Sequence, residues 1–404
     1  MIIIGGGAAG FFCAINAARM NPALRVTLVE KSSKLLSKVK VSGGGRCNVT
    51  HACFDIADMS RKYPRGGNFV KKTFHQFFTT DTIEWFRERG VELKTESDGR
   101  MFPTTESSQT IIDCLMREAS RHGINIMMNS EVKKVEKDGE EFEIHLSDNR
   151  MLKAQAICIA SGGYPKSAMF DWVKAIGHTI EDPVPSLFTF NIPRHPITQL
   201  MGISVEKARV KISGSKLEQE GPLLITHWGL SGPAVLRLSA WGARELKDRG
   251  WEFGIIVNWL PELNEQTLRE KMQTLRITLA TQKIINRNPF YLPQRLWEFF
   301  VTLAGIKEDT RWAELPAREQ NNLIKNLCAM EFSVKGKTTF KEEFVTAGGI
   351  RLAEVDANTM MSKKMPRIFF AGEILDVDGI TGGFNFQHAW TSGFIAALNI
   401  AAIK

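Results

Sequence analysis

Short, uninterrupted runs of apolar residues occur near both ends of this chain, over residues 2–4, 26–30, 154–160 and 367–373. Such runs are typical of strands that are buried on both faces of a parallel sheet. Residues with the spacing of an amphipathic helix alternate with them, over residues 9–20, 80–90, 107–122 and 384–400. The pattern predicts an α/β fold whose main sheet uses both ends of the chain.

Alternation of apolar and polar residues, the pattern of half-buried strands, occurs elsewhere. It predicts strands over residues 125–128, 132–136, 142–146 and 151–160, with a hairpin turn at 137–140. We expect this succession to be a crossover to the main sheet with a small antiparallel meander laid on it. In the middle of the chain the same alternation predicts strands over 187–192, 205–212, 223–226 and 251–257, with a helix over 234–249. Helical periodicity then predicts helices over 263–279, 294–303 and 316–330, before strands return at 331–334 and 344–350.

These elements predict a domain organisation with one insertion. The segment Asp182-Pro183-Val184-Pro185 marks a boundary, because the pattern changes at its prolines. We expect a first domain made of residues 1–184 and 344–404. We expect it to be interrupted by a β-rich domain, residues 185–260 and 331–343, that carries a helical cap over residues 261–330.

A glycine motif, Gly5-x-Gly7-x-x-Gly10, follows the first strand and begins the first helix, with Ala8 and Ala9 inside it. In a strand–turn–helix context, the first glycine makes the tight turn and the second allows close approach of a pyrophosphate. The third allows close packing of the helix on the sheet. The motif predicts a dinucleotide site at the positive end of the helix. The first strand has only three residues before the turn, so we expect the given start to be slightly truncated.

An acidic residue, Glu30, ends the second strand about twenty residues after the motif. A carboxylate there accepts hydrogen bonds from the hydroxyls of an adenosine ribose and repels a 2′-phosphate. The site is therefore predicted to hold FAD or NAD rather than NADP, with Lys31 beside the carboxylate.

A second unusual segment contains Ser42, Gly43, Gly44, Gly45, Arg46, Cys47 and Asn48. Three consecutive glycines make a regular helix or strand unfavourable, and they suit a loop that approaches a ligand. We expect this loop to wrap the pyrophosphate, with Lys38 and Arg46 supplying positive charge. Cys47 is expected to be a small buried side chain near the cofactor, because its spacing to Cys53 does not suit a redox disulfide.

Further contacts are expected where later strands end at the same sheet edge. Val132 is a candidate backbone contact for adenine, and Ser161, Gly162 and Gly163 follow the strand over 154–160. Gly372 and Glu373 end the last strand and can contact the ribityl chain or the pyrophosphate. The entry to the final helix, with Gly383, Phe384, Asn385 and Gln387, directs N–H groups toward the flavin ring, where they would stabilise the negative charge of its reduced form.

Composition limits the remaining possibilities. The 404 residues include 52 Lys and Arg against 44 Asp and Glu, a formal net charge of +8. Because the basic residues are interleaved with acids and no basic face with interleaved aromatics is apparent, the charge argues against a nucleic acid partner and suits anionic small molecules. Six scattered cysteines, no membrane-length apolar run and no signal peptide predict a cytoplasmic protein without a membrane partner. No metal site is expected, and the oligomeric state stays open.

Four segments carry a resemblance to a known family: the glycine motif, Ser42–Asn48, Thr226 to Pro233, and Gly372-Glu373 through Gly383. In these segments the chain resembles the bacterial BaiN/RdsA-type NAD(P)/FAD-dependent oxidoreductases, which are related to aminoacetone oxidase. The resemblance spans essentially the whole length. It implies a Rossmann-like FAD-binding domain interrupted by a β-barrel-like domain that carries a helical subdomain. It places flavin contacts at residues 5–10, 30, 42–48, 161–163, 372–373 and the entry to the last helix, and it transfers no catalytic residue.

The expected activity is hydride transfer through FAD to or from a small organic substrate. Since no second complete glycine motif is present, NAD(P)H would bind only transiently as the electron donor. The resemblance covers both amine oxidation and reduction of dehydro-bile acids, so an oxygen-using amine oxidase remains an alternative. A flavoprotein that acts on RNA and a redox sensor without turnover are alternatives of another class.

Overall fold

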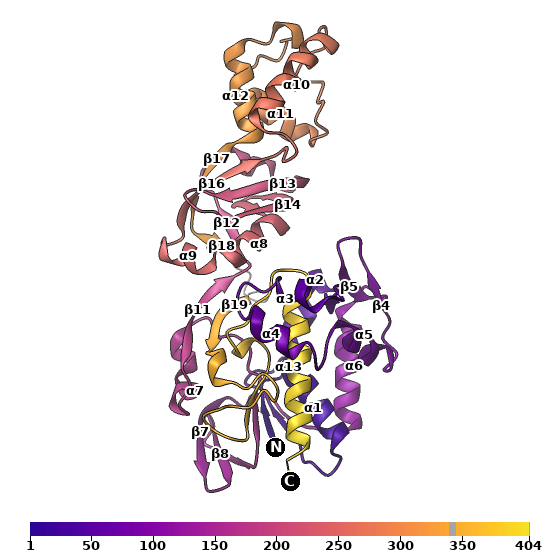
Figure 1. Ribbon diagram of the computed structural model, residues 1–404, viewed down its shortest axis with the longest axis vertical. Helices are drawn as coiled ribbons and strands as arrows, with labels where there is room; N and C mark the ends of the chain where they lie inside the picture. Colours follow the sequence, from indigo (N-terminus) through magenta and orange to yellow (C-terminus); the bar gives the residue numbers. More distant parts are fainter. Residues whose placement is uncertain (339–344, 404) are drawn as a thin grey trace. The chain divides into compact units, whose positions relative to one another are not determined.

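The computed structural model describes residues 1–338 and 345–403 (Figure 1). The chain forms two compact units, residues 1–186 with 340–404 and residues 187–339. The predicted boundary at 343/344, with the end of the predicted segment 331–343, lies outside the described residues.

The first unit contains a five-stranded parallel sheet of order β20-β10-β1-β2-β6. Its strands are β1 (Ile2–Ile4), β2 (Thr27–Val29), β6 (Asn125–Met127), β10 (Ile157–Ile159) and β20 (Ile368–Phe370). The central strand β1 pairs in register with β2 and β10, as Ile3 does with Leu28 and Cys158. All residues of β1, β10 and β20 are buried, which explains their uninterrupted apolar sequences.

Helices from opposite ends of the chain pack side by side in this unit, as the indigo α1 (Ala8–Met20) and the yellow α13 (Phe384–Ala401) show in Figure 1. The approach is close, since a Cβ on Gly393 would lie 2.7 Å from the Ala9 carbonyl oxygen. The other helices are α2 (Ser37–Gly45), α3 (Ile56–Ser60), α4 (Gly67–Thr73), α5 (Thr79–Arg87), α6 (Ser108–Arg121) and α7 (Asp171–Ala175).

Three smaller antiparallel sheets complete the first unit. They consist of β3 (Thr50–His51), β4 (Leu93–Thr95) and β5 (Arg100–Pro103); of β7 (Val132–Asp138), β8 (Glu141–Leu146) and β9 (Met151–Ala154); and of β11 (Ile180–Ser186) and β19 (Val345–Ile350).

Several element predictions need correction. The single strand predicted over 151–160 is two strands, β9 and β10, which belong to different sheets. The prolines at 183 and 185 lie within β11, where the register with β19 shifts between Glu181 and Val184. A two-stranded sheet tolerates proline because each strand has an unpaired side. The short helices α3 and α4 were not predicted.

The second unit contains a seven-stranded sheet of order β17-β16-β13-β14-β15-β12-β18 in which every pair is antiparallel. Its strands are β12 (Thr189–Asn191), β13 (Ser204–Ile212), β14 (Glu218–Thr226), β15 (Gly229–Ser231), β16 (Glu252–Asn258), β17 (Met330–Lys335) and β18 (Lys337–Thr338). Only Gly336 separates β17 from β18, and these two strands pair with β16 and β12 respectively. The structure establishes this inserted sheet, and its closure into a barrel stays a prediction.

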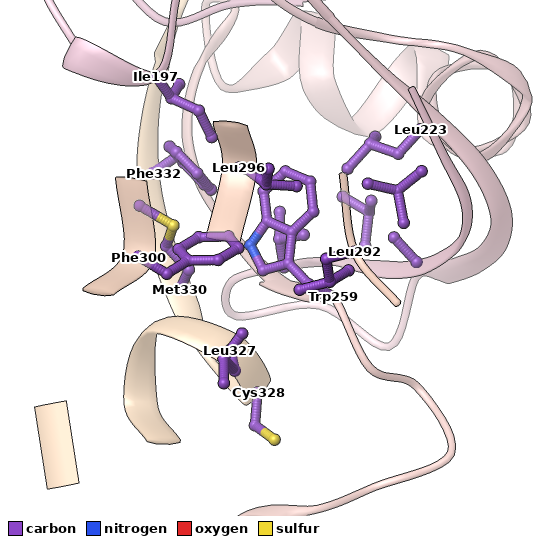
Figure 2. Packing of buried hydrophobic residues seen from close by; sticks show 14 of the residues in the cluster. Ile197, Leu223, Trp259, Leu292, Leu296, Phe300, Leu327, Cys328, Met330 and Phe332 are labelled. Atoms are coloured by element: carbon purple, nitrogen blue, oxygen red, sulfur yellow. The ribbon is translucent and has the colours of Figure 1, made fainter. Parts of the chain in front are cut away.

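The helices of the second unit are α8 (Pro233–Trp241), α9 (Ala243–Asp248), α10 (Glu265–Thr278), α11 (Gln294–Leu303) and α12 (Ala317–Cys328). The helix predicted over 234–249 is therefore two helices, which meet at Gly242. Figure 2 shows Trp259 packed against Phe300 of α11, with Phe332 of β17 nearby. The helical segment and the sheet thus share one continuous core.

Candidate dinucleotide site

The three glycines of the first motif have different surroundings. Gly5 has a φ of +118°, and a Cβ there would lie 2.3 Å from the Ala160 carbonyl oxygen. A Cβ on Gly10 would lie 2.0 Å from the Gly5 oxygen, whereas one on Gly7 would have no atom within 4 Å. Gly5 and Gly10 therefore permit close packing of the turn, and Gly7 leaves main chain accessible to a ligand.

Glu30 lies directly after β2 and is fixed against this turn. Its Oε2 accepts a hydrogen bond from the Gly6 N–H at 2.8 Å, and its Oε1 accepts bonds from the Ser32 N–H at 2.9 Å and hydroxyl at 2.8 Å. The carboxylate is therefore oriented before any ribose binds. No sequence pattern had indicated a role for Ser32. The ammonium of the neighbouring Lys31 lies 5.3 Å from the Tyr164 ring centroid.

Val132 begins β7 and is buried. The neighbouring Ser130 donates its N–H to the Glu30 carbonyl oxygen at 2.9 Å. This bond brings the start of β7 close to Glu30, so an adenine contact by Val132 agrees with the local geometry.

The glycine-rich segment interrupts α2. Ser42, Gly43 and Gly44 have non-helical dihedral angles, and a Cβ on Gly44 or Gly45 would have no atom within 4 Å. The main chain here is therefore open to a ligand, as at Gly7.

The side chains of this segment have partners within the protein. Arg46 pairs with Glu96 at 2.6 Å and Glu106 at 3.0 Å, and its guanidinium lies 4.0 Å from the Phe102 ring centroid. Cys47 is buried, and burial raises the pKa of its thiol to about 12, so it is a protonated, unreactive thiol. A cofactor contact from this segment would come mainly from its main chain.

Asn48 links this segment to the start of α13. With its carboxamide oriented by its partners, the nitrogen donates to the Thr50 carbonyl oxygen at 2.9 Å and the oxygen accepts the Gly383 N–H at 3.0 Å. A Cβ on Gly383 would lie 2.5 Å from the same Thr50 oxygen. Residues more than 330 positions apart in the sequence thus meet at this point.

Two later loops meet beside the glycine turn. Glu373, which follows β20, accepts a hydrogen bond from the Thr346 N–H at 2.8 Å and forms an ion pair with Lys38. A Cβ on Gly163 would lie 2.9 Å from the Glu373 Oε1, and one on Gly372 would lie 2.8 Å from the Ala9 Cβ. Residues 161–163, 372–373 and Lys38 therefore belong to the same edge of the sheet, and the Lys38 charge is balanced by Glu373.

The polar side chains at the start of α13 fix the main chain. Asn385 accepts from the Gly379 N–H at 2.8 Å and donates to the Gly379 carbonyl oxygen at 2.9 Å. The buried Gln387 accepts from the hydroxyls of Thr50 at 2.6 Å and Thr82 at 3.0 Å. These two side chains and Phe384, whose carbonyl oxygen accepts the Tyr63 hydroxyl at 2.6 Å, position the helix end.

A buried polar pair that the sequence did not suggest lies below Gly372. Ser392 accepts the Gly372 N–H at 2.8 Å, and His388 Nε2 lies 3.3 Å from the Gly372 carbonyl oxygen. Burial lowers the pKa of His388 to about 4, so the imidazole is neutral at pH 7. His388 and Ser392 lie one helical turn apart on the same face of α13. The sequence could have indicated this pair only if the face of the helix that packs on the sheet had been known.

The electrostatics of this edge suit a bound anion. Both α1 and α13 begin at glycine N-caps, without a side-chain cap and without an acidic residue in the first turn. Uncapped N–H groups and the helix dipole favour negative charge at such ends. In addition, the Thr346 hydroxyl is buried without a partner among the described residues. The open glycines, the fixed Glu30 and the two helix ends therefore fit a dinucleotide.

This geometry defines a dinucleotide-binding protein of the Rossmann-like class. Residues 1–399 match the family model described as HI0933-like protein Rossmann domain. The chain belongs to this family, whose members include FAD-dependent oxidoreductases, and it is itself a flavin-dependent enzyme of that class.

Two curated relatives are similar over nearly their whole length. The ribosomal RNA dihydrouridine synthase of Escherichia coli is 30% identical over 100% of this chain and 98% of its own. The 3-dehydro-bile acid delta(4,6)-reductase of Clostridium scindens is 27% identical over 98% of this chain and 97% of its own. Among solved structures, the 3-ketosteroid delta1-dehydrogenase from Sterolibacterium denitrificans has a TM-score of 0.54 at 12% identity, covering 100% of this chain and 99% of its own, which supports the fold alone.

The described residues contain neither a membrane-spanning helix nor a cluster of metal ligands. None of their helices combines the length and apolarity needed to cross a membrane. Across residues 1–338 and 345–403, no three His, Cys, Asp or Glu side chains gather as a metal site requires.

Proposed function

We propose that this enzyme reduces a carbon–carbon double bond conjugated to a carbonyl group, and that its substrate is a uracil base in ribosomal RNA. The reaction type is supported by the two curated relatives, because the substrates in their names contain the same kind of bond. A 3-dehydro-delta(4,6) bile acid has double bonds conjugated to a ketone, and uridine has its C5=C6 bond conjugated to the C4 carbonyl. Saturating either bond adds one hydride and one proton.

Bound FAD would supply the hydride and take up two electrons from a donor, for which NAD(P)H is our proposal. Glu30 would bind the adenosine ribose, and the main chain at Gly7, Gly44 and Gly45 would lie along the pyrophosphate. The uncapped N-terminus of α13 would stabilise negative charge on the ring system. The chain's contribution at this site is therefore orientation and electrostatics.

Charge distribution favours RNA over a bile acid. Residues 187–339 contain 21 Lys and Arg against 15 Asp and Glu, while the rest of the chain contains 31 against 29. The excess positive charge is thus concentrated in the second unit, and the expectation of an even spread along the chain is wrong. A polyanionic substrate profits from such an excess, whereas a steroid with one carboxylate profits little.

The test is anaerobic reoxidation of the chemically reduced holoenzyme by defined acceptors. Ribosomal RNA lacking dihydrouridine should restore the absorbance of oxidised flavin and gain dihydrouridine. A 3-keto-4-ene bile acid is the second acceptor and would support the bile acid reductase alternative if it alone reacts. Rapid reoxidation by oxygen alone, with no reaction with either acceptor, would contradict the proposal and favour an oxidase.

A further inference from the structure

One segment of the second unit departs from the interleaving of charges that holds elsewhere. Residues 271–297 contain five basic residues, and no Asp or Glu occurs among them. The basic residues are Lys271, Arg276, Lys283, Arg287 and Arg295. The same segment contains three aromatic residues, of which Phe290 and Trp297 are buried and Tyr291 is exposed. An exposed aromatic residue within a basic segment is a feature of proteins that bind single-stranded nucleic acid.

At the centre of this segment, a braced loop presents one aromatic side chain to solvent. Tyr291 is 96% exposed and has a φ of +56°. Asn288 holds the loop on both sides of it, because its Oδ1 accepts the Phe290 N–H at 3.1 Å and its Nδ2 donates to the Leu292 carbonyl oxygen at 2.5 Å. Phe290 and Leu292 are buried in the core of the unit. The fold therefore fixes the loop while leaving the Tyr291 ring without packing of its own.

Basic residues lie beside this loop. The Lys271 ammonium lies 5.2 Å from the ring centroid of Phe290, the residue next to Tyr291, and Lys283 and Arg287 precede the loop in the chain. Lys283 and Arg287 are exposed, and neither forms an ion pair with any residue that the structure describes. Both are thus available to an external anion.

Carboxylates also occur nearby. Glu270 and Glu298 flank the segment, and Glu308 and Asp309 precede Arg311 in the chain. Gln294 donates a hydrogen bond to Glu298 at 2.9 Å. The acids therefore border the segment in sequence, and none interrupts the run from Lys271 to Arg295.

A cavity of about 700 Å³ adjoins the loop. Its apolar lining includes Trp259, Leu260, Phe290, Tyr291 and Leu292. Lys271 and Lys207 also line it, together with Glu206 and Glu262, and Lys207 is paired with Glu262. The carboxylates balance Lys207, and Lys271 forms no ion pair with a described residue. An exposed ring beside an apolar hollow with this lysine at its border matches the chemistry of a nucleotide, which has a flat base and a charged phosphate.

We infer that this loop is an RNA contact site, at which a base of single-stranded RNA stacks on Tyr291 while Lys283 and Arg287 contact flanking phosphates. The inference rests on the proposed function for the identity of the polymer. An acidic protein segment would also be attracted by the charge, but it would not profit from an exposed aromatic ring held in a fixed loop. Stacking on aromatic side chains tolerates any base, so the site contributes affinity rather than sequence choice.

The experiment measures binding of the full-length holoenzyme to a fluorescent single-stranded RNA oligonucleotide and to a duplex of equal length, over a range of salt concentrations. Tyr291→Ala should weaken single-strand binding by about tenfold or more, and Tyr291→Phe should restore it because the ring remains. Lys283→Ala with Arg287→Ala should weaken binding and reduce the slope of log Kd against log salt by about 1.4, which corresponds to two phosphate contacts. The matched control, Lys216→Ala with Lys247→Ala, removes two charges elsewhere in the second unit and should keep the wild-type slope.

The FAD content and the rate of flavin reduction by the electron donor should be unchanged in all variants, since the loop belongs to the other unit. Equal losses in the loop and control variants would overturn the inference, because they would show general charge attraction. If Tyr291→Ala weakened duplex binding as much as single-strand binding, stacking on the ring would be ruled out. If the loop variants kept their RNA affinity but lost affinity for an acidic peptide, the surface would be a protein-binding site instead.

Failure of the inference and failure of the proposed function are distinguishable. If the wild-type enzyme forms dihydrouridine and the loop variants keep its RNA affinity, the inference is wrong and the function stands. If the loop variants lose RNA affinity and no dihydrouridine forms with the wild-type enzyme, the inference stands and the function is wrong.

Discussion

At the glycines of the first unit's candidate site the main chain is open to a ligand, whereas the loop at residues 288–292 of the second unit presents one side chain. At Gly7, Gly44 and Gly45 a Cβ would have no neighbouring atom within 4 Å, and the polar side chains nearby bind one another. At Tyr291 the main chain is held by Asn288 and the ring is exposed. A main-chain site suits one invariant ligand such as a cofactor, and an exposed side chain suits a substrate that differs among relatives.

Among the changes that test how the two units differ, the largest effect is expected at a buried ion pair of the first unit. Arg65 forms two hydrogen bonds with Asp378, and Ser186 donates to the same carboxylate at 2.8 Å. Since the Asp378 side chain is fully buried, Asp378→Ala leaves Arg65 without its partner and should lower the free energy of unfolding by about 3–5 kcal/mol. Urea unfolding measures this loss, and hydrogen exchange should show it in the first unit only. The double variant Arg65→Met with Asp378→Leu should recover part of the loss.

The glycine motif offers a matched pair of substitutions. Gly10→Ala should cost about 3 kcal/mol of folding free energy, because its Cβ would lie 2.0 Å from the Gly5 oxygen. Gly7→Ala should keep the stability of the apoprotein, since Gly7 has a φ of −93° and open space around it. The FAD affinity of the Gly7→Ala variant should nevertheless fall by roughly tenfold or more if the pyrophosphate lies against Gly7. Thermal unfolding and flavin titration separate the two effects, and full FAD affinity in Gly7→Ala would contradict the placement of the pyrophosphate.

His388 makes the stability of the first unit depend on pH. Its pKa is lowered from 6.5 to about 4 in the folded protein, so the unfolded chain takes up this proton at a higher pH. Stability should therefore fall as the pH falls from about 6.5 toward 4, by about 2 kcal/mol at about pH 5. His388→Gln should flatten that part of the profile in urea unfolding. Identical profiles for the two proteins would show that His388 does not titrate as its burial requires.

Glu30→Gln tests the ribose contact with little change in shape. The carboxamide oxygen can still accept the Gly6 N–H, but its NH2 group then faces the Ser32 N–H, and the charge that strengthens hydrogen bonds to ribose hydroxyls is lost. We expect FAD affinity to fall by roughly tenfold and the folding free energy to fall by about 1–2 kcal/mol, because the Ser32 N–H loses its acceptor. Flavin titration of the apoprotein provides the measurement, with Glu92→Gln, at an exposed residue, as the control.

Arg46→Ala should have the smallest effect. Its guanidinium is partly exposed and already paired with Glu96 and Glu106, so the loss of stability should be no more than about 1 kcal/mol. FAD affinity should change by less than about threefold. A loss of tenfold or more would show that Arg46 leaves these carboxylates and contacts phosphate, as the sequence predicted.

The sequence predicted the parallel strands and the glycine turn well, because each depends on local patterns: continuous apolar runs, glycine spacing and one acid at the end of a strand. It did not predict that Arg46 turns toward Glu96, or that Asn385 and Gln387 bind within the protein, since these partners come from distant segments. The strand β11 was missed because its two prolines read as a boundary. The basic segment 271–297 was visible in the sequence, but the exposure of Tyr291 required the structure.

Nucleoside mass spectrometry of ribosomal RNA incubated with the purified holoenzyme and a reductant tests the proposed reduction of uridine. The RNA should come from a strain that lacks the gene for this enzyme. We expect one uridine position to be converted to dihydrouridine, in an amount that rises with the enzyme added, and no conversion with the apoprotein. Unmodified ribosomal RNA, in a reaction where the same preparation reduces a conjugated steroid ketone, would contradict the proposed function.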